Sequence, residues 1–363
     1  MFLATNGVVT GVTLPVDGGL SIASPAAFLR PDFQERWLDL QDRWKGDAVT
    51  GLADGGPRLD VVGFGEAMVL VVPSGPLAAA TEAGLHVAGA ELNVCAAVAA
   101  LGATSAFATR VGADPFGARI IADVARLGVR TDLIDVDDRH PTGVFFKDVH
   151  PDGARRVYYY RAGSAAAHLS EADADRVLAA RPRLVVVSGI TAALGPAAEA
   201  AVTRLITGAR DAGVRVALDP NLRPAMGSVA VQAQRLLPLL RHVDVLLLGL
   251  DEAPWLFGAE DPASVLAAAV ECGAGTAVVK AGADGAYVLV ADAVTHVPTA
   301  ATAVVDPIGA GDAFAGGYLY GYLGGRDAYA SARLGSALAA RVMATVGDND
   351  GLPRPDEVAG LLA

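Results

Sequence analysis

A short glycine-rich turn near the C-terminal end of the chain carries an acidic side chain, Asp312. Residues 306–312 read DPIGAGD and lie between the apolar run TAVV and the helix-like run AFAGGYLYGYL. The β-branched residues of TAVV predict a buried strand, and the two glycines let the backbone approach a ligand closely. We expect a helix to begin at Asp312, where free backbone N–H groups bind anions, most often phosphate. A carboxylate beside bound phosphate could take a proton from a hydroxyl that attacks a phosphoryl group.

Asp312 could instead be an ordinary helix cap, because aspartate is among the preferred N-cap residues. Two other kinds of phosphate-binding loop are excluded by the sequence. None of the three lysines, at positions 45, 147 and 280, follows a glycine, so the chain has no Walker A loop. The GxGxxG spacing also fails, since Phe314 stands where the third glycine should be.

The composition excludes several classes of protein. The chain has 363 residues, 53% of them hydrophobic, and a formal net charge of −12. This acidic balance argues against a surface for nucleic acids or anionic membranes. The two cysteines, Cys95 and Cys272, lie far apart in helix-like contexts and predict no disulfide framework. There is no run of 18 apolar residues and no basic segment at the N-terminus, so we expect a cytoplasmic protein.

From residue 59 onward, short apolar segments alternate with helix-like ones. Strands are predicted in RLVVVSG, VRVALD, VDVLLLG and TAVVK, and the intervening helices are about a dozen residues long. This alternation predicts an α/β fold with a mostly parallel, doubly wound sheet. Two further segments, GVFFKDV and RRVYYYR, predict a hairpin around the turn HPDG. Ligands of such sheets bind outside the carboxyl ends of the strands, where DPIGAGD is expected.

Residues 1–58 have a different character, and we expect them to be an extension outside the main domain. The stretch VTGVTLPVDGGLSI resembles the last strand and tail of short-chain dehydrogenases over roughly twenty residues. The GxxxGxG and YxxxK motifs of that family are absent, so oxidoreductase activity is not supported. PDFQERWLDLQDRW then predicts an amphipathic helix that covers an apolar patch on the main domain or a partner.

The segment DPIGAGDAFAGGYL resembles the C-terminal signature DTxGAGD of the ribokinase-like (PfkB) sugar kinases, with Pro307 in place of threonine. VAGAELNVCAAVAALG resembles their N-terminal signature GGAxxNxAxxLARLG, with Ala88 at the first glycine position and Gly89, Ala90 and Asn93 retained. The resemblance implies a ribokinase-like three-layer domain over residues 59–363. It also implies a small β-sheet lid built from about residues 67–88 and 141–163, which often mediates assembly into homo-oligomers.

The resemblance further implies roles for individual residues. Asp312 would be the general base, and the backbone N–H groups of Gly309, Ala310 and Gly311 would hold the phosphoryl oxygens. Gly89, Ala90 and Asn93 would contact the sugar. VALDPNLRP resembles the DxNxR segment and KAGADGAY the KxGxxG turn. The ATP-binding residues would be Asp219, Asn221, Lys280, Gly282, Gly285, Asp306, Gly309 and Gly311.

Within the family, GEAMVLVVP, RVYYYRAGSAAAHLS and GDNDGLP resemble the branch that phosphorylates 2-keto-3-deoxygluconate. Tyr159 and Arg161 are two apart and share one face of a strand, and of the three tyrosines we expect only Tyr159 to contact the substrate. Alternation also predicts that Asp219, Asn221 and Arg223 point the same way. Arg161 and Arg223 would grip the carboxylate of a sugar acid, because a guanidinium binds carboxylates bidentately.

Two departures from the family pattern bear on the site. Phe145 stands where that branch often has a second tyrosine, so a hydroxyl contact would be lost and the preference between epimers could differ. In the NxxE motif, which organises the water shell of Mg²⁺, Gly249 replaces the asparagine while Glu252 is retained. Glu252 could equally be a simple carboxylate at a helix N-terminus.

We therefore expect transfer of the ATP γ-phosphate to O6 of 2-dehydro-3-deoxy-D-gluconate, with Mg²⁺ as cofactor. A kinase of the same fold for another sugar stays open: the galactonate epimer, 5-dehydro-2-deoxygluconate, fructose or ribose. A non-catalytic protein that binds sugar acids is a further alternative, against which the intact GAGD argues. A helix start would lower the pKa of Asp312 and nearby phosphates would raise it, and the sequence leaves the outcome open.

Overall fold

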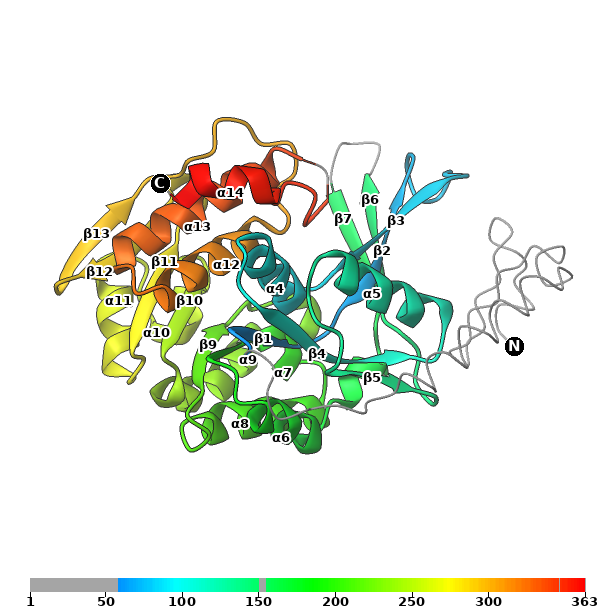
Figure 1. The fold of residues 1–363 in the computed structure, drawn as a ribbon, viewed down its shortest axis with the longest axis horizontal. Coiled ribbons are helices and arrows are strands. Elements are labelled where there is room, and N and C mark those ends of the chain that lie inside the picture. Colours follow the sequence, from blue (N-terminus) through cyan, green and yellow to red (C-terminus); the bar gives the residue numbers. More distant parts are fainter. Residues whose placement is uncertain (1–57, 150–154, 346, 363) are drawn as a thin grey trace, which may run out of the picture.

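A computed structural model describes residues 58–149, 155–345 and 347–362 (Figure 1). The extension predicted over residues 1–58, with its dehydrogenase-like stretch and aromatic helix, lies outside the described residues except for Arg58. Within the described residues, no helix has the length and apolar character needed to cross a membrane.

A nine-stranded sheet forms the centre of the large domain, in the order β13-β12-β11-β10-β9-β8-β1-β4-β5. The seven strands β11, β10, β9, β8, β1, β4 and β5 run parallel to one another. Strand β12 pairs antiparallel with β11, and β13 pairs antiparallel with β12. This confirms the predicted doubly wound α/β sheet. The parallel strands read as unbroken apolar runs because both of their faces are covered, as in VLLLG of β10. The nine strands are β1 (Val61–Phe64), β4 (Ser105–Gly112), β5 (Ile134–Asp137), β8 (Leu184–Ser188), β9 (Arg215–Asp219), β10 (Val245–Gly249), β11 (Thr276–Lys280), β12 (Ala286–Val290) and β13 (Ala293–Val297).

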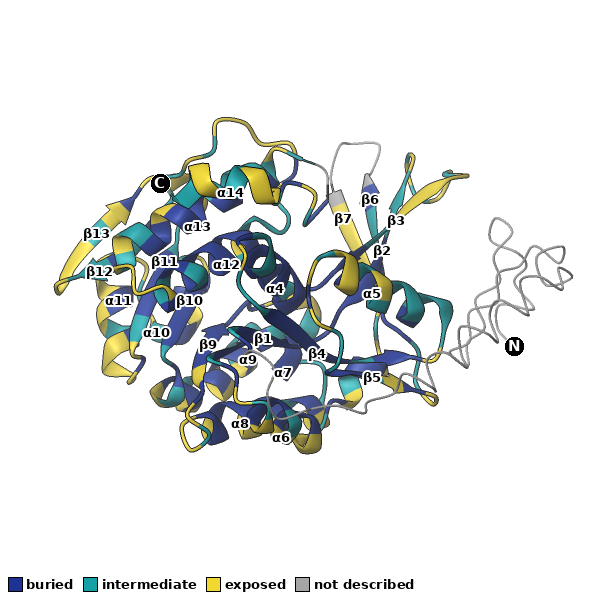
Figure 2. Ribbon diagram, in the orientation of Figure 1, coloured by how far each residue is buried: buried dark blue, intermediate teal, exposed yellow. Residues whose placement is uncertain are grey.

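Helices cover both faces of the large sheet (Figures 1 and 2). Neighbouring strand residues belong to opposite cores. Val62 belongs to a core that also contains residues of α6, α8, α9, α10 and α11, whereas Val61 belongs to a core that contains residues of α4, α5, α12 and α13. The helices are α4 (Ala90–Ala100), α5 (Pro115–Arg126), α6 (Glu171–Ala179), α7 (Gly189–Ala192), α8 (Pro196–Ala209), α9 (Val229–Leu236), α10 (Ala253–Phe257), α11 (Pro262–Glu271), α12 (Ala310–Leu323), α13 (Ala328–Met343) and α14 (Pro355–Leu362). Short 3₁₀ helices span Ala165–His168, Pro224–Met226, Leu237–His242 and Gly282–Asp284.

A second, four-stranded sheet, here called the lid sheet, has the order β3-β2-β6-β7. Its strands are β2 (Met68–Pro73), β3 (Ala83–Ala88), β6 (Val144–Val149) and β7 (Arg155–Tyr160). Strands β6 and β7 pair antiparallel with Phe145 opposite Tyr159, which confirms the predicted hairpin, although its turn lies outside the described residues. Phe145 packs with Met68, Leu70 and Ala88 in a small core on one face of this sheet.

The strand predicted for TAVV at residues 302–305 is wrong. This segment is irregular, and Val304 and Val305 are 62% and 47% exposed. No strand of the large sheet pairs with this segment, which instead runs past the end of α13. There the N–H of Val305 donates to the carbonyl of Met343 at 2.7 Å. β-branched residues form a strand only where a neighbouring strand pairs with them.

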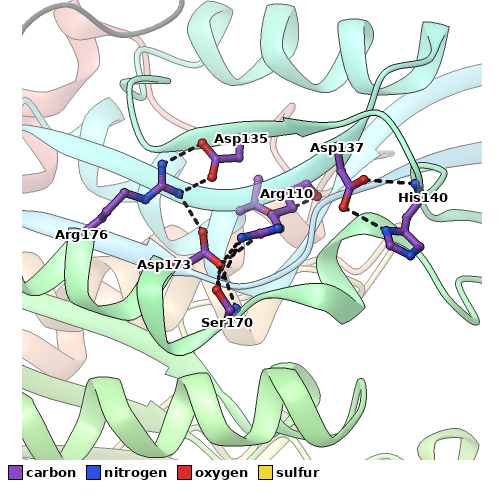
Figure 3. A network of polar contacts seen from close by, with 8 residues as sticks. Arg110, Asp135, Asp137, His140, Ser170, Asp173 and Arg176 are labelled. Atoms are coloured by element: carbon purple, nitrogen blue, oxygen red, sulfur yellow. Dashed lines mark hydrogen bonds and ion pairs between the residues drawn. The ribbon is translucent and has the colours of Figure 1, made fainter.

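A polar network ties α6 to strands β4 and β5 (Figure 3). Asp173 is 4% exposed at its side chain and accepts from the backbone N and Oγ of Ser170, at 2.8 and 2.7 Å. It also accepts from Arg110 Nε at 3.0 Å and from Arg176 Nη2 at 2.8 Å, and Arg176 reaches on to Asp135. One carboxylate therefore holds the start of a helix and two guanidinium groups.

Replacing Asp173 with alanine is expected to lower the free energy of unfolding by about 2–3 kcal/mol, because it leaves two arginines without their shared carboxylate. Although burial raises the pKa of Asp173, hydrogen bonds from Ser170 and Arg110 bring it below its usual value. A lowered pKa contributes stability that is present at neutral pH and lost as the pH falls through the folded-state pKa. Urea unfolding should therefore show the full difference at pH 7 and a smaller one below about pH 4.

The control is Asp175→Ala in the same helix, where Asp175 pairs with Arg204 at the surface and is 53% exposed. It should change the urea midpoint little, because exposed ion pairs contribute little to stability. Equal losses in the two variants would contradict the role given to Asp173.

Candidate active site

The two signature segments meet at the first turns of α4 and α12, which pack side by side (Figure 1). Helix α12 begins at Ala310, and Gly309 is its N-cap residue with a left-handed φ of 82°. The predicted start at Asp312 is therefore two residues late, and Asp312 is not the cap. Its side chain points instead to Asn93 of α4, whose Nδ2 donates to Asp312 Oδ2 at 2.8 Å.

The surroundings of Asp312 favour its protonated form. Burial is the largest cause and raises the pKa of Asp312 to about 7, with the negative charges of Asp219 and Asp348 adding to the rise. The hydrogen bond from Asn93 and the charge of Lys280 oppose it. The rise therefore comes from burial and neighbouring carboxylates, two causes that the sequence did not indicate. A carboxyl group with this pKa can accept and release a proton near neutral pH.

Lys280, at the end of β11, places a cation in front of the α12 N-terminus. A Cβ added at Gly311 would lie 3.8 Å from Lys280 Nζ. Lys280 forms an ion pair with Asp219 at the end of β9. Burial alone would lower the pKa of Lys280, but the carboxylates of Asp219 and Glu252 raise it above its usual value. A permanent ammonium beside the positive end of a helix favours an anion at this place.

Glu252 connects the loops that follow β9 and β10. Its Oε1 accepts from the N–H of Leu222 at 2.5 Å and its Oε2 from the N–H of Gly249 at 2.7 Å. It is the N-cap residue of α10, but its side chain makes no capping bond there. Burial first, and then the charge of Asp219, raise the pKa of Glu252 to about 7. In the part of the chain that the structure describes, no group of three or more histidine, cysteine, aspartate or glutamate side chains is arranged to hold a metal ion.

The segment after β9 does not continue as the predicted extended chain. Asn221 has a left-handed φ of 42°, which breaks the side-chain alternation expected for Asp219, Asn221 and Arg223. Asp219 and Asn221 are buried at 7% exposure, whereas Arg223 is exposed. The Arg223 guanidinium contacts the carbonyl of Leu222 at 3.2 Å, and no described contact joins it to another predicted site residue.

Tyr159 and Arg161 share one face of the lid sheet, as predicted. The Arg161 guanidinium carbon lies 5.7 Å from the centre of the Tyr159 ring, which stacks on Phe145 at 5.6 Å. Arg161 is 10% exposed at its side chain and forms an ion pair with Glu66. Glu66 is buried, and Ser164 Oγ donates to its Oε1 at 2.5 Å. Burial raises the pKa of Glu66, against the effect of Arg161. Glu66 was not predicted from the sequence; its one signal was an acidic residue two positions after the end of β1, in GEAM.

The predicted glycines have mostly backbone reasons for being glycine. Gly89 is the N-cap residue of α4, and a Cβ there would lie 2.4 Å from the carbonyl oxygen of Glu66. Its close approach is thus to the chain itself, and Ala90 follows as the first residue of the helix. Gly282 and Gly285 have left-handed φ values of 58° and 95° and form the turn between β11 and β12.

Asp306, Gly309, Ala310 and Gly311 lie on the turn that leads into α12. Asp306 is 8% exposed, and its Oδ1 accepts from the N–H of Ile308 at 3.2 Å. The N–H of Ala310 already donates to the carbonyl of Pro307, at 3.3 Å. Among the three predicted phosphoryl-binding amides, Ala310 therefore has a competing partner.

Three residues near this turn were missed by sequence reasoning: Lys147 from β6, and Asp348 and Asn349 after α13. Asn349 Nδ2 donates to Asn93 Oδ1 at 3.0 Å. The segment GDNDGLP was noted as a branch signature, but its spacing gave no role to its members. Lys147 stood out only as a lysine that follows no glycine.

Comparison with known proteins adds to this geometry. A model of the pfkB family carbohydrate kinases matches residues 59–355. The chain is 36% identical over 310 residues to a 2-dehydro-3-deoxygluconokinase of Thermoproteus tenax. The aligned region covers 84% of this chain and 94% of that protein. It is 30% identical over 311 residues to the 2-dehydro-3-deoxygluconokinase of Bacillus subtilis strain 168, covering 84% and 96%. The crystal structure of a PfkB protein from Polaromonas sp. JS666 is similar with a TM-score of 0.74 at 32% identity, covering 83% of this chain and 99% of that one.

Proposed function

Because the chain belongs to the pfkB family of carbohydrate kinases, we propose that it transfers the γ-phosphate of ATP to O6 of 2-dehydro-3-deoxy-D-gluconate. The observation that carries the proposal is that Asp312 and Lys280 both lie at the start of α12. They supply a proton acceptor and an anion site within one turn of helix. The two relatives named for this substrate support the choice of sugar.

In the proposed reaction, Asp312 accepts the O6 proton while O6 forms a bond to the γ-phosphorus. The bond from that phosphorus to the bridging oxygen breaks, and ADP leaves with the electron pair. The helix start and the N–H groups of Gly309, Ala310 and Gly311 hold the phosphoryl oxygens, together with the Lys280 ammonium. Gly282 and Gly285 shape the nucleotide side, and Gly89, Ala90 and Asn93 line the sugar side. Without water in the site, the sugar is the one acceptor of the phosphoryl group.

Mg²⁺ is the cofactor that this chemistry calls for, since it neutralises charge on the phosphates when bound. The residues fit a hard cation with a water shell. Asn221 Oδ1 is a buried oxygen without a hydrogen-bond partner, and the carboxylates of Asp219 and Glu252 lie in the same cluster. We propose that Asp219, Asn221 and Glu252 orient those waters, with Glu252 also fixing the loops that carry them.

Arg161 is the proposed partner of the substrate carboxylate. Arg161→Lys keeps the positive charge beside Glu66 but removes the planar fork, so we expect the KM for the sugar acid to rise about tenfold with a smaller change in kcat. Arg161→Ala should raise it further. Steady-state kinetics with the acid and with fructose check this prediction. An unchanged KM for the acid would favour a kinase for a neutral sugar.

The experiment that tests the function is an ADP-release assay with Mg-ATP and a panel of acceptors. The panel holds 2-dehydro-3-deoxygluconate, its galactonate epimer, 5-dehydro-2-deoxygluconate, gluconate, fructose and ribose, with Asp312→Asn as the control. Turnover confined to the 2-keto-3-deoxy acids supports the proposal. Equal turnover of fructose or ribose would leave the kinase chemistry in place and overturn the assignment to a sugar acid. Binding of the acids without turnover would favour the non-catalytic alternative.

We also propose that two copies assemble through the lid sheet and that the protein works in the cytoplasm. Tyr158 and Tyr160, which alternate with Tyr159 along β7, are 40% and 63% exposed, and Figure 2 colours most of this strand as exposed. Aromatic side chains on an open face of a sheet are typical of an interface. Both cysteines are free, which suits a reducing compartment. The mass in solution tests the assembly.

A further inference from the structure

Lys147 reaches from the lid sheet to the turn that precedes α12. Its Nζ lies 3.4 Å from Asp306 Oδ2 and 3.3 Å from Asp348 Oδ1. The Lys147 side chain is 14% exposed, and the carboxylates of Asp306 and Asp348 are 11% and 6% exposed. The two ion pairs are therefore largely shielded from water. Shielded ion pairs interact more strongly than pairs at a surface. They join the lid sheet to the turn before α12 and to the segment after α13.

Asp348 in turn lies next to the proposed base. A Cβ added at Gly309 would lie 3.1 Å from the Cα of Asp348, so its backbone packs on the catalytic turn. Asn93 Nδ2 donates to Asp348 Oδ2 at 3.4 Å as well as to Asp312 Oδ2 at 2.8 Å. The bond from Asn349 to Asn93 Oδ1 fixes which side of this amide faces the two carboxylates. Lys147, Asp348, Asn93 and Asp312 thus form one continuous row of contacts.

We infer that Lys147 is a positioning residue for Asp312: it brings a cation to Asp348 when the lid sheet lies against the turn, and so reduces the negative charge beside the proposed base. The inference rests on the proposed role of Asp312. Closure of the lid sheet over the sugar would then also prepare Asp312 to take the O6 proton. An open lid would leave Asp348 uncompensated and Asp312 more readily protonated.

Charged and polar groups face Asp312 from every element around it. Asn93 and Glu91 come from α4, Asp219 from the end of β9, Lys280 from the end of β11 and Asp348 from the segment after α13. Asp219 and Asp348 raise the pKa of Asp312, and Lys280 lowers it. Among the described residues, Lys147 is the one cation within ion-pair distance of Asp348. Loss of the Lys147 charge should therefore raise the pKa of Asp312.

The test is the pH dependence of kcat/KM for Lys147→Gln. Because Asp312 acts as a base, kcat/KM falls as the pH drops through its pKa. Removing the ammonium should move this acid limb upward by about half a unit to one unit, the size expected for the loss of one charge that acts across a partly screened site. At pH 6 the variant should lose about 3–10-fold in kcat/KM, while at pH 9 it stays near wild type. Lys147→Arg should restore the limb.

Asp348→Asn supplies the opposite perturbation and keeps an oxygen that can accept from Asn93. It should move the acid limb downward, and in its background Lys147→Gln should shift the limb far less. If Lys147→Gln fails to fold, Asp348→Asn alone carries the test. An acid limb of the kcat/KM profile that does not move in Asp348→Asn would overturn the inference.

The matched control is Arg119→Gln. Arg119 Nη2 of α5 donates to the carbonyl of Leu85 in β3 at 2.6 Å, so it also joins the lid sheet to the large domain but does not contact Asp348. It should leave the acid limb in place whatever it does to KM. If Lys147→Gln changes KM and leaves the acid limb in place, Lys147 only holds the lid sheet against the large domain and the inference is wrong. Turnover that survives in Asp312→Asn would overturn the proposed base and this inference together.

Discussion

Replacing Asp312 with asparagine is expected to lower kcat by about 10²–10⁴-fold, with the KM values for sugar and ATP changed much less. The oxygen of the new amide can still accept from Asn93, so the local structure should persist. What is lost is the group that takes the O6 proton. Because the pKa of Asp312 is raised to about 7, the wild-type rate should fall as the pH drops below this value. The variant should lack that acid limb. Steady-state assays of ADP release between pH 5 and pH 9 measure both effects.

Asp327→Asn is a matched control for this prediction. Asp327 also stands at the start of a helix, where its carboxylate accepts from the N–H of Ala330 at 2.7 Å, but it has no contact with the site. Its kcat should stay within about twofold of wild type, because surface substitutions away from a site have small effects. If Asp312→Asn retained more than a tenth of the wild-type kcat, Asp312 would not be the base.

The large sheet could be predicted because parallel strands buried on both faces carry their signal locally. Each predicted strand from RLVVVSG to TAVVK at residues 276–280 is present. The failure of TAVV at residues 302–305 has the same origin, since its letters resemble those of β11 but no strand of the sheet pairs with it. Whether a partner strand exists is a property of the whole sheet, and no local window contains it.

The candidate site likewise contains residues that the sequence predicts and residues that it does not. Asp312, Asn93 and the glycines of the turn are found from short motifs at the ends of elements. The ion pairs of Arg161 with Glu66 and of Lys147 with Asp348 join distant segments, the second pair across 201 positions. Neither a motif nor a periodicity connects such residues. The bend at Asn221 was hidden for a different reason, because asparagine only tolerates a left-handed φ and does not require it.

Gly311→Ala is expected to separate catalysis from stability. Gly311 is the second residue of α12 and has no left-handed φ, so alanine suits the backbone and should stabilise the helix by up to about 1 kcal/mol. The new methyl group would meet only Lys280 Nζ, at 3.8 Å, and would occupy the space proposed for the phosphoryl oxygens. We expect kcat to fall about 10²–10³-fold while Tm stays level or rises, since a displaced or blocked oxyanion donor costs this much. Kinetics and thermal unfolding of one preparation measure both.

Gly309→Ala, two residues earlier, is the informative contrast. Gly309 has a φ of 82°, and its added Cβ would lie 3.1 Å from both the Cα and the carbonyl oxygen of Asp348. Strain of this kind costs about 1–2 kcal/mol, so this variant should lose stability as well as rate. A fall in rate with intact stability in Gly311→Ala alone would then reflect the blocked space and not a damaged turn. A wild-type rate in Gly311→Ala would mean that the phosphoryl group does not pass between Lys280 and the start of α12.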